Sequence, residues 1–74
     1  EQAAEQAFAD LARASAIARK LALGPTLAKC HFDRGTLEAR LGRASAARRS
    51  FLAARNVFRR YQMPSWVSRT EQGL

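Results

Sequence analysis

Two sets of side chains in the first half of the chain are of types that can do covalent or acid–base chemistry. Cys30 and His31 could form a nucleophile and a base, and Asp33 and Glu38 could form a pair of carboxylates. Neighbouring residues on a helix point about 100° apart, and residues five apart do not share a face well. Neither spacing places such groups against one substrate. One Cys and one His are also too few for a structural zinc site. We therefore expect no catalytic residue, no metal and no cofactor, and the chain is not expected to be an enzyme.

The distribution of charge is the stronger functional signal. The chain of 74 residues has 13 Lys and Arg against 6 Asp and Glu, which gives a net charge of +7. The charges of residues 1–38 cancel, whereas residues 39–70 hold eight arginines and no acid. Such an asymmetry indicates an acidic partner, which could be nucleic acid, lipid headgroups or an acidic protein. Arg is also a good helix former that suits exposed positions, so a plain solvated surface is an alternative.

The arginines concentrate on one predicted helix, residues 45–62. There an apolar stripe recurs at helical spacing, with the aromatic residues Phe51, Phe58 and Tyr61 on it. We define the arginine face as the five arginines beside this stripe and further round the helix: Arg48, Arg49, Arg55, Arg59 and Arg60. Guanidinium groups bind phosphate and carboxylate with two hydrogen bonds. Since the three aromatic residues are expected in the core, no stacking platform for bases is left. A protein-facing or solvated surface is therefore preferred over nucleic acid and over an anionic membrane.

All of these residues are expected on helices, because no stretch shows the alternation of apolar and polar residues that is typical of a strand. Gly24 is predicted to end the first helix as its left-handed residue, with Pro25 opening the next. Gly42 is predicted to end the second helix, and Ser45 to cap the third. Pro64 breaks the third helix. The sequence thus predicts an all-α fold of three or four helices, at residues 2–23, 26–41, 45–62 and 65–73.

Three kinds of protein are excluded by composition. No apolar run approaches the roughly 18–20 residues of a membrane span. One Cys cannot form an internal disulfide, which excludes a disulfide-stabilised secreted mini-protein. The chain is too rich in Ala, Leu and Phe to be disordered. We expect a cytoplasmic location.

An internal repeat of 40 residues relates the first helix to the third. Shifting the chain by 40 residues aligns four positions of similar size, namely Ala7, Leu11, Ala14 and Ile17 with Ala47, Phe51, Ala54 and Val57. Two helices that recur at this period are typical of an α-solenoid.

The second and third helices carry the residues of a known pattern. These are Ala28 to Phe32, Gly35, Leu41 to Arg43, the Ala47…Phe51…Ala54 spacing, Tyr61 to Met63, and Trp66 with Val67. The pattern resembles the tetratricopeptide-type repeats of large bacterial signalling proteins, which join cyclase, ATPase or transcription-regulator domains to helical repeats. The resemblance implies a right-handed stack of antiparallel helices, in which Gly35 and Ala47 permit close approach and Phe51 fills the gap.

The chain departs from that pattern at two positions of the second helix. Arg34 stands where a large apolar residue is usual, and Glu38 where an aromatic residue is usual. Their i, i+4 spacing allows them to pair on one helix face. Either the packing is altered here or this face is exposed. Pro64 is also displaced from the position at which the short repeat ends.

The resemblance also implies a binding groove, since the first helix of each such repeat lines the concave face. By position the groove residues are Lys29, Phe32, Asp33, Thr36 and Arg40. Lys29 and Arg40 could receive acidic groups of a peptide, and Phe32 could hold an apolar one. Trp66, near Pro64, is either part of the core or an interface anchor.

These observations favour a non-catalytic protein-interaction or scaffolding segment. We expect it to belong to a longer repeat region of a bacterial signalling or regulatory protein, and to bind a protein or peptide, in particular an acidic one. The apolar ends of such a segment also favour self-association. The alternative is a small nucleic-acid-binding helical module that uses the arginine face.

Overall fold

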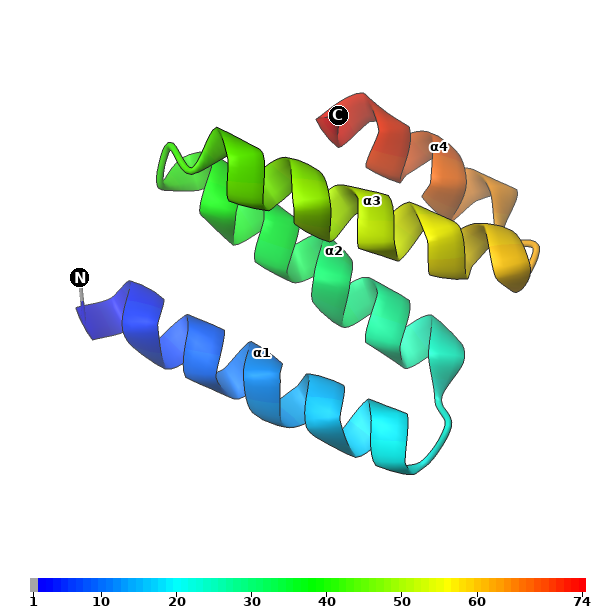
Figure 1. Cartoon of the computed structure of the whole chain (residues 1–74), viewed down its shortest axis with the longest axis horizontal. Coiled ribbons are helices and arrows are strands. Elements are labelled where there is room, and N and C mark those ends of the chain that lie inside the picture. Colours follow the sequence, from blue (N-terminus) through cyan, green and yellow to red (C-terminus); the bar gives the residue numbers. More distant parts are fainter. Residues whose placement is uncertain (1) are drawn as a thin grey trace.

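Four α-helices follow one another along the chain in the computed structural model, which describes residues 2–74 (Figure 1). They are α1 (Gln2–Lys20), α2 (Gly24–Arg40), α3 (Ala44–Arg60) and α4 (Pro64–Gly73). Each helix runs antiparallel to the one before it and packs mainly on its neighbours in the chain, so α2 lies between α1 and α3 (Figure 1). Residues 2–74 contain no strand, which confirms the all-α prediction. None of the four helices combines the length and apolar character needed to cross a membrane.

The three connections between helices have the same geometry. Helices α2, α3 and α4 begin at residues 24, 44 and 64, so their starts are 20 residues apart. In each turn the middle residue has a positive φ, at Ala22 (56°), Gly42 (74°) and Gln62 (54°). The amide of the next residue donates a hydrogen bond to the carbonyl five residues earlier, with lengths of 2.8, 2.9 and 3.0 Å. This is the Schellman arrangement, which satisfies carbonyl groups at a helix end.

The structure corrects two predictions about helix ends. Gly24 is not the left-handed residue after α1, because α1 ends at Lys20, Ala22 takes the positive φ, and Gly24 is the first residue of α2. Ser45 does not cap α3, which begins at Ala44 after an N-cap residue, Arg43, that makes no side-chain cap. The shared turn sets both ends, since each helix starts directly after three connecting residues. Gly42, predicted only to end the second helix, takes the left-handed conformation that was expected of Gly24.

The core is concentrated between α2 and α3. Ala28, Ala54 and Phe58 are fully buried there, and Phe51 is nearly so. A Cβ on Gly35 of α2 would lie 2.9 Å from the Phe51 ring, and a Cβ on Gly73 of α4 would lie 2.9 Å from the same ring. The phenyl ring is therefore held between two glycines. The predicted close approach of Gly35 and Phe51 is confirmed.

Large apolar side chains remain exposed at the helix ends. On α1 and the turn after it, Ile17, Leu21 and Leu23 are 52%, 61% and 44% exposed. Tyr61 is 47% exposed, so the prediction that it lies in the core is wrong. Tyr61 is the first residue beyond α3, where the chain has left the helical stripe, and its ring lies against Gly24.

Candidate interaction surfaces

The arginine face divides into paired and unpaired members. Glu71 of α4 forms ion pairs with two arginines of α3, at 3.7 Å from Arg55 and 3.1 Å from Arg59. The side chain of Arg55 is only 25% exposed, and its Nε is buried with no hydrogen-bond partner. Arg55 and Arg59 thus help to hold α4 on α3. Their pairing with Glu71 was not predicted from the sequence, although Glu71 is the one acid after residue 38.

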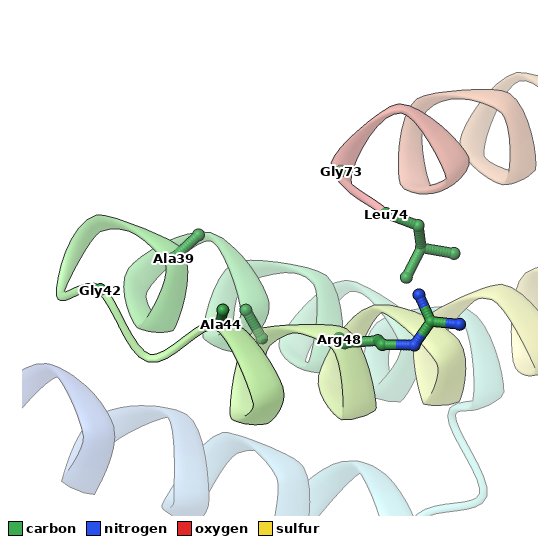
Figure 2. Close-up of a pocket in the computed structure, with 7 residues that line it drawn as sticks. Ala39, Gly42, Ala44, Arg48, Gly73 and Leu74 are labelled. Atoms are coloured by element: carbon green, nitrogen blue, oxygen red, sulfur yellow. The ribbon is translucent and has the colours of Figure 1, made fainter.

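The other three members of the arginine face are exposed: Arg48, Arg49 and Arg60. Arg48 lines a cavity of about 350 Å³ that separates the start of α3 from the end of α4. Figure 2 shows its guanidinium group directed toward Leu74, with Ala39, Gly42 and Ala44 on the other side of the cavity. Arg49 and Arg60 lie on the opposite flank of α3, among residues that face α1 and α2.

The residues predicted to line a concave groove lie on the side of α2 away from α1. Lys29, Asp33 and Arg40 are exposed there. Phe32 is half-buried, and its ring meets Phe51 edge-on at 5.6 Å. The Thr36 hydroxyl donates a hydrogen bond to the Phe32 carbonyl at 3.1 Å. Phe32 and Thr36 are thus already engaged within α2 and the aromatic cluster.

Trp66 joins this aromatic cluster from α4. Its indole stacks on Phe58 at 5.1 Å with an interplanar angle of 17° and meets Phe32 edge-on at 5.5 Å. Lys29 Nζ lies 5.4 Å from the ring centroid and the Arg69 guanidinium 4.7 Å, both within cation–π range. Trp66 is half-buried and packs against the core, with cations over its exposed part.

Two cavities that were not predicted from the sequence lie along the opposite side of α2. Residues of α2 and α3 line the polar cavity, whereas residues of α1 also line the apolar one. Arg19 of the apolar cavity acts on the charge of His31 in the polar cavity, and we call the two together the α1–α3 groove. The polar cavity, of about 230 Å³, is lined by His31, Arg34, Glu38, Ala46, Arg49, Ser50 and Ala53. The apolar cavity, of about 240 Å³, is lined by Ala18, Arg19, Ala22, Leu23, Gly24, Leu27, Val57, Arg60 and Tyr61.

The acid of the polar cavity is buried and satisfied. Glu38 is only 6% exposed. Its Oε1 accepts a hydrogen bond of 2.5 Å from the Ser50 hydroxyl of α3, and its Oε2 lies 3.6 Å from Arg34 Nε. The i, i+4 pair that the sequence predicted is present, and it is the carboxylate rather than the guanidinium that is buried. Ser50 gave no signal in the sequence, since only the packing of α3 on α2 brings it to Glu38.

His31 lies half-buried between cations of two helices. Burial lowers its pKa below the usual value of 6.5, and the charges of Arg19 on α1 and Arg34 on α2 lower it further. The neutral imidazole is therefore favoured, and a cation is disfavoured by the positive charge around it. This part of the α1–α3 groove carries a positive potential that an anion would relieve.

The residues considered for catalysis lie in different environments. Cys30 is buried and free, whereas His31 lines the polar cavity. Asp33 is on the exposed side of α2, and Glu38 is buried on the other. Within residues 2–74, no group of three or more His, Cys, Asp and Glu side chains could hold a metal ion.

No family model matches this chain, and neither a curated protein nor a solved structure matches it. The four helices show the all-α class, and the resemblance to tetratricopeptide-type repeats stays an expectation.

Proposed function

We propose that this chain is a non-catalytic protein-binding module that holds a partner polypeptide against its helical surface. The observation that carries this proposal is the α1–α3 groove, where cations from three helices stand beside two cavities, one of them largely apolar. Concave sites with apolar walls and a few polar groups are typical of binding sites. The exposed side of α2, with Lys29, Asp33 and Arg40, offers a second surface for the same partner or another.

The setting of the module follows from its resemblance and its spacing. The 20-residue spacing of three identical turns supports a repeating stack of helix pairs, as in an α-solenoid. We infer that the module acts as a scaffold within a larger cytoplasmic signalling or regulatory protein of bacterial type. Exposed Ile17 on α1 and Leu21 in the turn after it would be covered by a further helix of such a stack or by self-association.

A nucleic-acid-binding module is the second candidate, favoured by the net charge of +7 and by the exposed members of the arginine face. Phosphate contacts from Arg48, Arg49 and Arg60 would supply sequence-independent affinity. The ion pairs of Glu71 with Arg55 and Arg59 weaken this candidate, because they remove two of the five arginines from a phosphate-binding surface.

Peptide display and oligonucleotide titration together test the proposal. A random peptide library is selected on the immobilised chain at physiological salt, and labelled duplex DNA and single-stranded RNA are titrated by fluorescence anisotropy at low and physiological salt. We expect enriched peptides that still bind at physiological salt, and oligonucleotide binding that is lost between the two conditions. Oligonucleotide binding that survives physiological salt, together with no enriched peptide, would make the second candidate the function.

A further inference from the structure

The α1–α3 groove has an excess of positive charge that nothing within it balances. Arg19 comes from α1, Arg34 from α2, and Arg49 and Arg60 from α3. Glu38, the one acid among the described lining residues, is already engaged with Arg34 and with the Ser50 hydroxyl. The groove therefore favours a ligand that carries negative charge.

The apolar cavity, at one end of the groove, is suited to an apolar group of a ligand. The apolar cavity has Leu23, Leu27 and Val57 in its lining, next to the start of α2. Leu23 is 44% exposed, so its burial by a ligand would be favourable. The ligand that matches both ends has a large apolar group and several anionic groups a short distance away.

Charge and polarity together decide between the classes of ligand. A second copy of this chain also carries +7, so two copies would bring like charges together at the groove. A nucleic-acid backbone has phosphates for the arginines but no group suited to the apolar cavity. A peptide that combines Asp or Glu with a Leu or Phe satisfies both cavities.

We propose that the α1–α3 groove binds an acidic peptide segment, with a large apolar side chain in the apolar cavity and carboxylates against Arg19 and Arg49. The site deepens the proposed protein-binding function and rests on it. It differs from the groove that the sequence predicted, which lies on the other side of α2. Helix α2, which contributes to both cavities, has 17 residues, about 25 Å at 1.5 Å per residue, which an extended peptide of about eight residues spans.

His31 gives the site a distinguishing property. The charged groups around it are Arg19 on α1, Arg34 and Glu38 on α2, and Arg49, which lines the same cavity from α3. A bound carboxylate offsets the guanidinium charges, so the imidazole takes up a proton more readily in the complex. The affinity for the peptide is therefore expected to rise as pH falls from 7.5 toward 6. In the His31→Gln variant the affinity should depend less on pH.

The test uses labelled peptides of designed composition. The probe is a peptide of about eight residues with glutamates on both sides of a central Phe. One matched control replaces the Phe by Gly, and the other replaces every Glu by Gln. Binding is followed by anisotropy at physiological salt, and the site is mapped from amide shifts in the NMR spectrum of the chain. We expect both controls to bind about tenfold more weakly, and the largest shifts at Leu23, His31 and Val57.

Variants separate this groove from the rest of the basic surface. R19Q/R49Q removes two groove cations and leaves the Arg34–Glu38 pair intact, so binding is expected to weaken about tenfold. R13Q/K20Q makes the same change in net charge at two exposed residues that line neither cavity, and should alter affinity less than about twofold. Circular dichroism of both variants shows whether they remain folded.

The other outcomes overturn the proposal in different ways. Shifts confined to Lys29, Asp33 and Arg40, with binding unchanged in R19Q/R49Q, would move the site to the exposed side of α2 and leave the proposed function standing. Equal binding of the probe and its Gln control would contradict the acidic specificity of the groove. If the probe peptide does not bind at all, and oligonucleotides bind tightly at physiological salt, both proposals would be overturned.

Discussion

The ring of Tyr61 lies against Gly24 so closely that a Cβ on the glycine would overlap it. This contact joins the residue after α3 to the first residue of α2, and both residues line the apolar cavity. The role of Gly24 is thus to admit a neighbouring side chain, although the sequence suggested a role in turning the chain. The contact therefore forms part of the wall of the apolar cavity.

Gly24→Ala is expected to displace Tyr61 rather than to unfold the chain. Tyr61 is 47% exposed and its ring can turn outward into solvent, so the loss of stability should stay below about 1 kcal/mol. In a Tyr61→Ala background the same change should be neutral or slightly stabilising, because Ala suits a helix better than Gly. Urea denaturation of the four proteins of this double-mutant cycle measures the coupling. Equal effects of Gly24→Ala in both backgrounds would contradict the contact.

Gly35→Ala is expected to destabilise the fold by about 1–3 kcal/mol, because the Phe51 ring is buried and cannot yield to an added methyl group. Gly73→Ala, on the other side of the same ring, serves as the matched control. It should cost less, since Gly73 is the last residue of α4 and can move with the helix end. Chemical denaturation gives both values. Replacing Phe51 by Leu in the Gly35→Ala protein should recover part of the loss.

The middle residue of each of the three turns has a positive φ, so replacing it should change stability in a direction that depends on whether it is glycine. Ala22→Gly and Gln62→Gly should each stabilise the chain by about 1 kcal/mol, since both residues adopt a left-handed conformation that costs a side-chain-bearing residue free energy. Gly42→Ala should destabilise by about the same amount. A Cβ on Gly42 would meet nothing within 4 Å, so this cost is conformational alone. Thermal denaturation of the three variants checks the signs, and a stabilising Gly42→Ala would refute the assignment.

Ser50→Ala should cost about 1–3 kcal/mol, because it removes the hydroxyl donor from the buried Glu38 carboxylate. Ser45→Ala, at an exposed position in the first turn of α3, is the control and should change stability by less than about 0.5 kcal/mol. The double variant E38M/S50A replaces both partners by apolar groups and should recover most of the loss. A Ser50→Ala protein as stable as the control would show that the hydrogen bond contributes nothing.

Stability is expected to fall as the pH is lowered from about 7.5 to 5.5, in part through His31. Its pKa in the folded chain lies below the usual 6.5 because of burial and of Arg19 and Arg34. The unfolded chain therefore binds the proton more tightly, so this contribution is complete above pH 6.5 and decreases from there down to the folded-state pKa. His31→Gln should flatten the dependence, as measured by the urea midpoint at several pH values. An unchanged slope would exclude His31 as its source.

The sequence predicted each helix better than it predicted their contacts. Helical spacing located the buried stripe of α3, and the resemblance to the tetratricopeptide-type pattern predicted the Gly35–Phe51 packing. Spacing within one helix does not show which neighbour covers which flank, so the half-buried state of Phe32 and the exposure of Tyr61 were not foreseen. The α1–α3 groove was missed for the same reason, because its cations come from three helices far apart in the sequence.

Packing almost entirely between consecutive helices has a consequence for how the chain folds. Contacts are close in sequence, so little loop entropy opposes them and folding is expected within microseconds to milliseconds. The α2–α3 hairpin holds most of the core and can form first, with α1 and α4 added at its two sides. Amide hydrogens of α1 and α4 should then exchange with solvent through partial openings that leave the central hairpin protected.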